Sequence, residues 1–206
     1  MPYTHEIDPW CIDAGCRARL RRGWGVGEST TLIAAVGDPA SSVDAMLAIT
    51  SVGLARETGR DAALLLDPRA RGVRRAREVI RGIGRGEWQI VDDRARQPWE
   101  VLPGCDAGLV MSGGLHAGWV MAAGKPIVAL DNASAREQLE GGKTALFAGD
   151  EKAGKIAWAI CRLMDDRALS RRIGENARAV ARLRYGGSDR MSGAAGPMAA
   201  DRGVST

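Results

Sequence analysis

The sequence has no apolar run long enough to cross a membrane and no signal-peptide pattern at its start. A membrane-spanning helix needs roughly 18 consecutive apolar residues, and no stretch of the 206-residue chain approaches that length. The opening stretch, MPYTHEIDPW, carries acidic residues where a secretory signal carries basic ones. We therefore expect a cytoplasmic protein without a transmembrane segment.

Histidine and cysteine are too few or too scattered for the common catalytic and metal sites. The chain has only 2 histidines, His5 and His116, so a Ser-His-Asp triad has no support. Its 4 cysteines do not form two pairs at zinc-binding spacing; they are Cys11, Cys16, Cys105 and Cys161. We expect reduced thiols, and the sequence predicts neither a metal site nor a cofactor.

Aromatic residues are rare, and no block of one charge sign is present. Aromatics make up 4% of the chain, and its net charge of +4 comes from arginines spread along the sequence. Nucleic-acid-binding proteins tend to concentrate basic residues on one element. A solvated, Arg-rich surface is the favoured interpretation, and we expect no nucleic-acid partner.

Short apolar runs alternate with helical patterns along the chain, which is 45% hydrophobic and so has material for a core. Strand patterns occupy 30–37, 62–66, 87–92, 106–112, 125–131 and 144–149. Helical patterns occupy 41–59, 71–84, 97–105, the stretch through Met121, 133–139, 151–165 and 168–184.

This alternation predicts an α/β fold: a single Rossmann-like domain with a parallel sheet and helices on both faces. We expect a leading segment and linker helix over 1–29, the domain itself over 30–185, and a disordered tail over 186–206, where small, polar and glycine residues predominate. Ligands of such sheets bind outside the carboxyl ends of the strands. The candidate loops are therefore those after Val36, Leu66, Val91, Val110 and Leu130.

Three glycine-rich stretches do not meet the requirements of nucleotide-binding motifs. GWGVG, over 23–27, precedes the first strand, whereas a dinucleotide fingerprint follows one. GIGRG, over 82–86, has the wrong spacing and ends a helix. GGKT, over 141–144, has Glu137 where a P-loop needs its first glycine. All three are predicted to be turns or caps.

The stretch SGGLHAG, which begins at Ser112, has the composition of an anion-binding loop. Ser112, Gly113 and Gly114 lie between a predicted strand and a predicted helix. Glycines there allow a ligand to approach the backbone closely, and a helix N-terminus favours phosphate. A plain strand-to-helix turn explains the same residues equally well.

A series of phrases, in order from Ile7 to Tyr185, resembles the C-terminal, donor-binding half of GT-B fold glycosyltransferases of family 4. CDAGLVMS resembles the family's "ADvfvlPS", and VMAAGKPIVALD resembles "EAMAaGkPVVatd". REQLEGGKTALFAGD resembles "rEqledGkTGLLv", and AWAICRLMDDRALSRRIGENARAVARLRY resembles the family's closing helices. IDPWCIDAGCRARLRRGWGV resembles the segment that leads into this half.

The resemblance implies binding of a UDP- or GDP-linked sugar donor. The donor-binding positions that it implies are Gly37, Ser112, Gly113, Gly114, Leu115, His116 and Glu137. A surface turn remains an alternative for His116, and a solvated helix residue for Glu137. The sequence identifies no catalytic residue.

Several family positions that carry charge in these enzymes differ here. The paired glutamates of the family align with Met111 and Trp119. The family's Arg and Lys after the first strand contact the donor diphosphate, but this chain has Asp38 in the Arg position and no Lys. An aspartate there repels a diphosphate instead of neutralising it, so we expect weak or no transfer by this chain alone.

Two alternatives remain open. A GT-B enzyme also needs an acceptor-binding domain, and this chain begins at the linker into the second half, so a separate domain or chain is an expected partner. The first alternative is therefore a non-catalytic subunit, pseudoenzyme or fragment, with Trp10 and Trp119 as candidates for an exposed docking face, although a place in the buried core is the more common one for a tryptophan. The second is a protein like UDP-N-acetylglucosamine 2-epimerases, whose paired glutamates align with Ala117 and Gly118.

Overall fold

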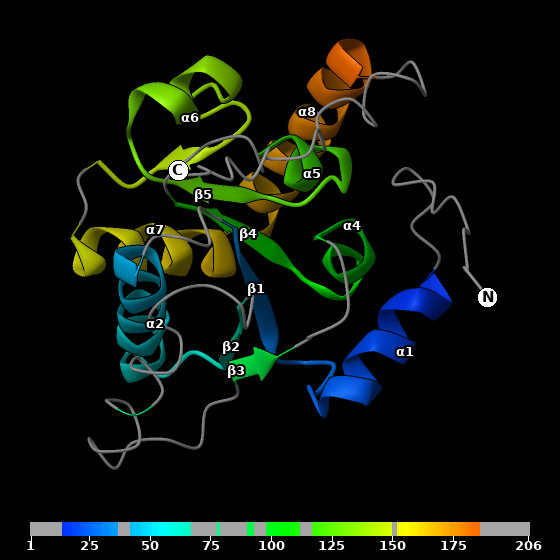
Figure 1. The fold of residues 1–206 in the computed structure, drawn as a ribbon, viewed down its shortest axis with the longest axis vertical. Helices are drawn as coiled ribbons and strands as arrows, with labels where there is room; N and C mark the ends of the chain where they lie inside the picture. The colour runs from blue at the N-terminus through cyan, green and yellow to red at the C-terminus, as the bar shows by residue number, and fades with distance from the viewer. Residues whose placement is uncertain are drawn as a thin grey trace, which may run out of the picture.

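A parallel sheet of 6 strands, covered by helices on both faces, forms the protein (Figure 1). The computed structural model describes residues 14–36, 42–66, 78, 90–92, 98–111, 117–149 and 152–185. Every pair of neighbouring strands is parallel. The predicted α/β, Rossmann-like fold is confirmed.

The elements fall where the sequence patterns placed them. The strands are β1 Thr31–Val36, β2 Ala62–Leu66, β3 Ile90–Asp92, β4 Ala107–Val110, β5 Ile127–Ala129 and β6 Leu146–Phe147. The helices are α1 Ala14–Trp24, α2 Ser42–Glu57, α4 Pro98–Val101, the 3-10 turn η1 Leu102–Gly104, α5 Ala117–Ala122, α6 Ala133–Gln138, α7 Ala153–Asp165 and α8 Arg167–Tyr185. The tail expected over 186–206, and the basic helix expected over 71–84 apart from Glu78, lie outside the described residues.

Two of the three glycine-rich stretches are turns, as predicted. Gly25 follows α1 with a φ of 67°, and Gly142 lies in the turn before β6 with a φ of 73°. Positive φ angles of this size cost little only for glycine. The third stretch, over 82–86, lies outside the described residues.

The strand order is β3-β2-β1-β4-β5-β6. Strands β2 and β3 are added outward on one side of β1 and the last three strands on its other side, so the strand order reverses between β1 and β4. These two strands pair in register from Ile33 opposite Ala107 to Val36 opposite Val110. In open parallel sheets, the point of reversal opens a crevice at the carboxyl ends of the two strands. The topology therefore marks the β1–β4 edge as the place for a ligand.

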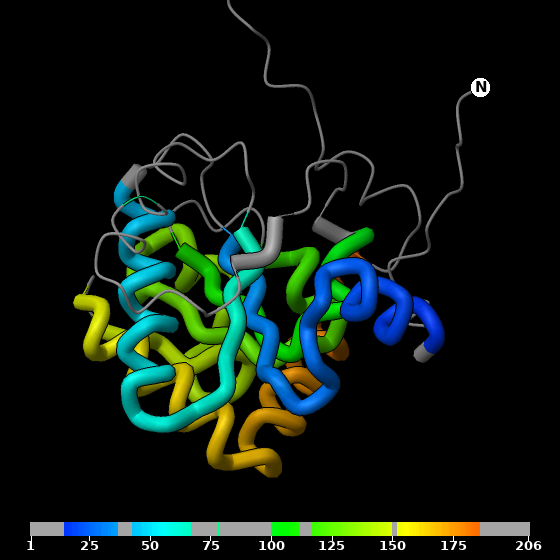
Figure 2. Tube along the Cα trace, turned by 90° about the horizontal axis from the view of Figure 1, so that it is seen from below, coloured from blue at the N-terminus to red at the C-terminus, as the bar shows by residue number. Residues whose placement is uncertain are grey.

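Alternate strand residues supply two separate apolar cores. Ile33 of β1 joins a core with α2 and α7, whereas Leu32 and Ala34 join a core with α5 and the second half of α8. Figure 1 shows α2 and α7 on one side of the sheet and α1, α4 and α5 on the other. Figure 2, turned by 90°, likewise shows α1 and α2 on opposite sides. This layering is what a side-chain period of two produces in a strand buried on both faces.

Helix α1 is fastened to the amino ends of the central strands by one buried arginine. The side chain of Arg21 has an exposed fraction of 0%. Its guanidinium donates to the carbonyl of Gly104 at 3.1 Å and to the carboxylate of Asp106 at 3.0 Å. It also donates to the carbonyls of Gly27 and Thr30. A buried charge is tolerated only with such partners, so these contacts fix α1 against β1 and β4.

Helix α8 packs against the turn before β5 through two glycines. A β-carbon at Gly174 would clash with the carbonyl oxygen of Gly124. Gly124 itself has a φ of 66°. Only residues without side chains allow the helix and the turn to approach this closely, so the position of α8 depends on Gly174.

The described cysteines, Cys16, Cys105 and Cys161, are free thiols. Cys105 is fully buried before β4, and burial raises the pKa of its thiol to about 12. Such a thiol is unreactive near neutral pH because the thiolate is the nucleophile. Among the helices of the described residues, none is both long and apolar enough for a membrane span.

Replacing Arg21 with methionine is expected to destabilise the protein by about 3 kcal/mol, because Asp106 and several carbonyl groups lose their donor while the site stays buried. Urea unfolding followed by circular dichroism would measure the change. The control is Arg22→Met at the neighbouring exposed position, which should change the free energy of unfolding by no more than about 0.5 kcal/mol. Equal losses in both variants would contradict the role given to Arg21.

Alanine is expected to have opposite effects at two helical glycines. Gly174→Ala should destabilise by about 1–3 kcal/mol because of the clash with Gly124. Gly23→Ala in α1 meets no atom within 4 Å and should stabilise by up to about 1 kcal/mol through helix propensity. Thermal unfolding of both variants tests the packing of α8, and a stabilised Gly174→Ala protein would disprove it.

Candidate functional site at the carboxyl ends of strands β1 and β4

The roots of two predicted ligand loops meet at the carboxyl edge of the sheet. Val36 ends β1 directly beside Val110 of β4. The backbone N–H of Met111 donates to the carbonyl of Val36 at 2.9 Å, which extends the pairing by one residue. The loops that begin at Gly37 and at Ser112 therefore leave the sheet from adjacent positions, although they lie far apart in the sequence.

The structure shows the strand ends next to the predicted donor residues but does not describe most of those residues. Six of the seven positions, Gly37 and Ser112 to His116, lie outside the described residues. Glu137 is described: it is exposed on α6, which follows β5. Because β5 is the neighbour of β4, Glu137 lies on the helix that follows the next strand along the same edge.

Helix α5 begins at Ala117, immediately after the predicted glycine loop, and has 6 residues. Most of these residues are buried, Ala117 and Gly118 among them. A helix of this length contributes only a small dipole. An anion at this edge would therefore gain little from the dipole of α5.

The two positions aligned with the family's glutamates belong to the apolar interior. The side chain of Met111 has an exposed fraction of 1% and joins the core under α2 and α7. Trp119 is half-buried and packs against the core on the other face of the sheet. Neither residue offers a carboxylate, and Trp119 serves partly as core packing.

A cluster of polar side chains follows strand β5 at the same edge. Arg136 of α6 donates two hydrogen bonds to the carboxylate of Asp131, one of them at 2.8 Å. Its guanidinium carbon lies 5.3 Å from the centre of the Phe147 ring, a cation–π distance. Asn132 caps α6 by accepting a hydrogen bond from the backbone N–H of Ala135 at 2.8 Å.

The Arg136–Asp131 pair was not identified from the sequence, which pointed only to the loop after Leu130. The available signal was an aspartate directly after a predicted strand and an arginine one turn into the next helix. The hydrogen bonds from Arg136 lower the pKa of Asp131, and the same contact raises the pKa of Arg136. Both groups stay charged at neutral pH, so the cluster holds an ion pair with little net charge.

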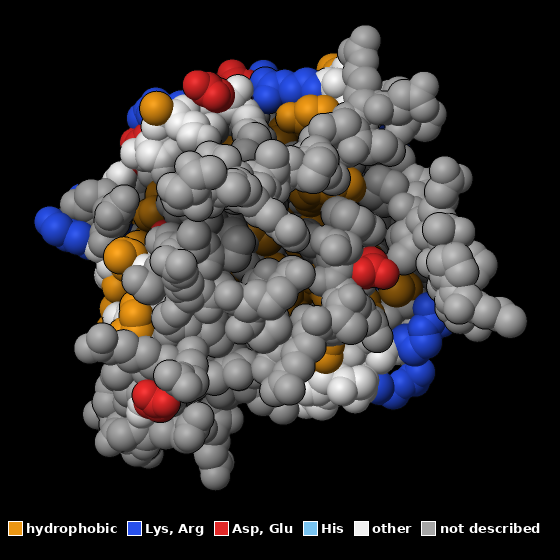
Figure 3. Space-filling view, viewed as in Figure 1, with side chains coloured by type: hydrophobic (Ala, Val, Ile, Leu, Met, Phe, Trp, Pro, Cys, Tyr) orange, Lys and Arg blue, Asp and Glu red, His pale blue; other side chains and the backbone are white. Residues whose placement is uncertain are grey.

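Basic side chains are dispersed around this part of the surface. Figure 3 shows Lys and Arg groups at several separate places on the face viewed, near α6 and α8, near α1 and near α7. This distribution agrees with the expected Arg-rich, solvated surface. Within the described residues, no group of three or more His, Cys, Asp or Glu side chains is placed to hold a metal ion.

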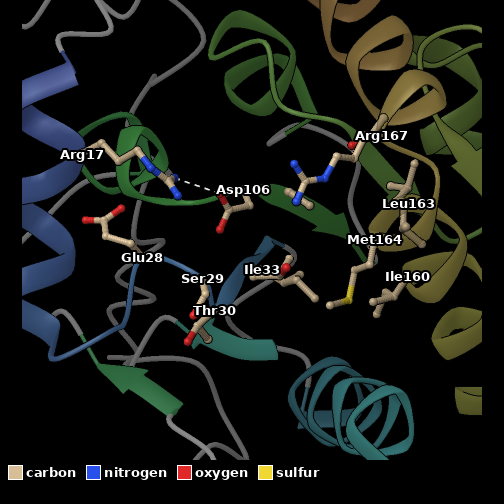
Figure 4. Close-up of a pocket in the computed structure, with 14 residues that line it drawn as sticks. Arg17, Glu28, Ser29, Thr30, Ile33, Asp106, Ile160, Leu163, Met164 and Arg167 are labelled. Atoms are coloured by element: carbon tan, nitrogen blue, oxygen red, sulfur yellow. Dashed lines mark ion pairs between the residues drawn. The ribbon is translucent and has the colours of Figure 1, made fainter. Parts of the chain in front are cut away.

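A hollow of about 450 Å³ lies at the opposite, amino edge of the sheet (Figure 4). Its lining includes Thr31 at the start of β1 and Ala107 at the start of β4. It is therefore separated from the β1–β4 carboxyl edge by the length of the strands, and it is a different site from the one that the sequence predicts.

Comparison of sequences relates the second half of the chain to a known family. The family model described as "Glycosyl transferases group 1" matches residues 114–180. That span begins at the second glycine of the predicted loop and continues through most of α8. A search of curated proteins found no match.

Comparison of structures shows the GT-B glycosyltransferase fold. HepE of Anabaena, solved with UDP and glucose, aligns with a TM-score of 0.70 and 20% identity over 84% of this chain and 48% of that chain. A glycosyltransferase of Rickettsia africae aligns with a TM-score of 0.69 and 18% identity over 84% and 48%. The C-terminal domain of LpcC of Francisella tularensis, a group 1 glycosyl transferase, aligns with a TM-score of 0.67 and 15% identity over 82% and 92%.

These likenesses confirm the resemblance to the C-terminal half of GT-B glycosyltransferases. This chain spans about half the length of the first two proteins, at 48% of each. It spans nearly all of the isolated LpcC domain, at 92%. The fold shared with all three is the single Rossmann-like domain.

Replacing Arg136 with glutamine is expected to raise the pKa of Asp131 toward its usual range, because the hydrogen bonds that hold it down are lost. A depressed aspartate pKa favours the folded state above about pH 4, and this contribution disappears as the pH falls through the folded-state value. Carboxyl carbon NMR titration would follow Asp131 directly. Asp165, whose pKa is lowered by Arg60, is the internal control and should be unchanged; an unchanged Asp131 would contradict the assignment.

Proposed function

We propose that this chain is the donor-binding half of a GT-B glycosyltransferase and binds a UDP- or GDP-linked sugar at the β1–β4 edge. The observation that carries the proposal is the meeting of the two loop roots, at Val36 and Val110, at the point where the strand order reverses. Ligands of open parallel sheets bind at that point. HepE, which shares the fold, was solved with UDP and glucose.

The donor would lie against backbone groups more than against charged side chains. The proposed contacts are the residues that follow the two roots and Glu137 on α6: Gly37, Ser112, Gly113, Gly114, Leu115, His116 and Glu137. Glycines at 113 and 114 allow a diphosphate to approach main-chain N–H groups, and His116 is positioned in sequence to donate a hydrogen bond. Glu137 is proposed to contact the sugar nucleotide from the helix beside this edge.

We infer that the chain alone transfers little or no sugar. Departure of a nucleoside diphosphate requires stabilisation of the charge that develops on it. The positions that supply charged contacts in the family hold Met111, Trp119 and Asp38 here. The first is fully buried and the second is half-buried in the core, and neither side chain carries a charge.

A second candidate function is that of a non-catalytic subunit that works with another chain. The alignments cover only 48% of HepE and of the Rickettsia protein, so each of these proteins has a further part that this chain does not match. In this candidate function, a further domain or chain would carry the acceptor site.

Calorimetric titration of the purified chain with UDP, GDP and their sugars would test donor binding. We expect saturable binding that is lost in Gly113→Asp, because a carboxylate in the glycine loop repels the diphosphate and fills its space. His116→Ala should weaken binding by about tenfold, as expected for the loss of one hydrogen bond to a charged group.

The matched control is Gly23→Asp, which adds the same charge on α1, where no atom lies within 4 Å. This variant should bind the donor as the parent protein does. Absence of binding at millimolar ligand by a protein that circular dichroism shows to be folded would refute the proposal and leave a scaffold role. Binding without measurable transfer to added acceptors is expected for both candidate functions, whereas measurable transfer would contradict the inference that this chain alone is inactive.

A further inference from the structure

Three arginines of α8, Arg167, Arg171 and Arg178, line a second hollow, of about 460 Å³, at the amino edge of the sheet, with Glu175 as the one acidic residue in the lining. Lys125, from the turn before β5, also lines this hollow, but its Nζ atom donates to the carbonyl of Pro103 at 3.4 Å. Helix α8 as a whole carries 6 arginines and 1 glutamate. The hollow is therefore positive, and its complementary ligand is an anion.

The spacing of these arginines explains why they gather here. Arg167, Arg171, Gly174 and Arg178 follow one another at intervals of four, three and four residues, which places them on one face of a helix. Gly174 presses that face against Gly124. The side chain of Arg178 lies over Gly124, near its backbone. The close glycine contact thus holds the arginines of α8 against the turn before β5.

The first hollow at the amino edge, of about 450 Å³, adjoins the basic one, because Arg167 and Ser170 line both. Its floor is apolar and is formed by side chains from β1, β5 and α7: Ile33, Val128, Ile160, Leu163 and Met164. Figure 4 shows the guanidinium of Arg167 reaching from the start of α8 across this hollow toward Asp106. A basic pocket and an apolar pocket therefore share one wall.

The acidic groups of the apolar hollow already have basic partners. Asp106 forms ion pairs with Arg17 at 2.8 Å and with Arg21 at 3.0 Å. Glu28 lies 3.9 Å from Arg21. Because these carboxylates are paired, Arg167 and the other arginines of α8 dominate the electrostatic potential at the shared wall. The acidic residues therefore do not repel an anion there.

We propose that the two hollows form one binding site for a single-chain amphiphile with a phosphate head group. The head group lies between Arg167 and Arg171, whose guanidinium groups bind phosphate oxygens in pairs. The hydrocarbon chain lies on the apolar floor beside Leu163 and Met164, where it is removed from contact with water. Each hollow has a volume in the range of small-molecule sites, and the site lies at the opposite edge of the sheet from the proposed donor loops.

Isothermal titration of the full chain with dodecyl phosphate, below its critical micelle concentration, tests the proposal. We expect saturable binding with a stoichiometry of one. Inorganic phosphate, which lacks the chain, and dodecyl maltoside, which lacks the charge, should each bind at least about tenfold more weakly. These two arms distinguish a phosphate-headed amphiphile from a free phosphate and from unspecific detergent binding.

Two variants separate the roles of the hollows. Arg171→Ala should weaken dodecyl phosphate binding by about tenfold, and Met164→Glu should weaken it at least as much by placing a carboxylate on the apolar floor. Arg172→Ala is the matched control, because Arg172 is the next residue on α8, is exposed and lines neither hollow. Circular dichroism of each variant verifies that it is folded. Because Arg171 is exposed, Arg171→Ala should fold even if Met164→Glu disturbs the apolar floor.

Three results would overturn the inference: no saturable binding of dodecyl phosphate, equal affinity in Arg171→Ala and Arg172→Ala, or equal affinity for inorganic phosphate and dodecyl phosphate. The donor proposal is tested separately. Gly113→Asp should leave dodecyl phosphate binding unchanged, and Arg171→Ala should leave binding of UDP unchanged.

Discussion

The buried guanidinium of Arg21 is the contact on which the arrangement of this domain depends. It binds carbonyl groups that precede β1 and the carboxylate of Asp106 that precedes β4, so one side chain ties together the starts of the two central strands. Asp106 in turn accepts a hydrogen bond from the backbone N–H of Leu32 at 2.8 Å. Because parallel strands in register keep the same offset along their length, fixing β1 and β4 at the amino edge also fixes where both end. The meeting of Val36 and Val110 at the opposite edge follows from that constraint.

Most of the fold could be predicted from the sequence, because its strands are buried on both faces and appear as short apolar runs. The run at 62–66 matches β2 residue for residue. The runs at 125–131 and 144–149 overestimate β5 and β6, which have 3 and 2 residues, since apolar residues beside a strand pack into the core without joining its hydrogen bonds. Strand order is not encoded in any local pattern. The sequence analysis therefore predicts no strand order, and the order comes from the structure alone.

Only the parts of the candidate site that lie in a local sequence motif could be predicted. The glycine pair at 113 and 114 pointed to the loop, and the topology brings the root of that loop beside the end of β1. The Arg136–Asp131 pair depends on the geometry of α6 leaving the sheet, and the basic hollow depends on α8 packing against a turn about fifty residues earlier in the chain. Contacts of this kind join residues that lie far apart in the sequence, so no periodic pattern predicts them. The role of Trp119 was likewise undecided from sequence, since half-burial in the core depends on how α5 and α8 meet.

The two edges of the sheet differ in their side chains and in how firmly the packing of the domain holds those side chains. At the carboxyl edge, Met111 is buried in one core and Trp119 packs against the other, and the Arg136–Asp131 ion pair carries little net charge. At the amino edge, arginines are held in place by a glycine contact that costs the helix its propensity at Gly174. A helix retains such a residue when close packing is worth more than local stability. The position of the basic face of α8 is therefore built into the packing of the domain, whereas the proposed donor site at the other edge depends on the loops that follow β1 and β4.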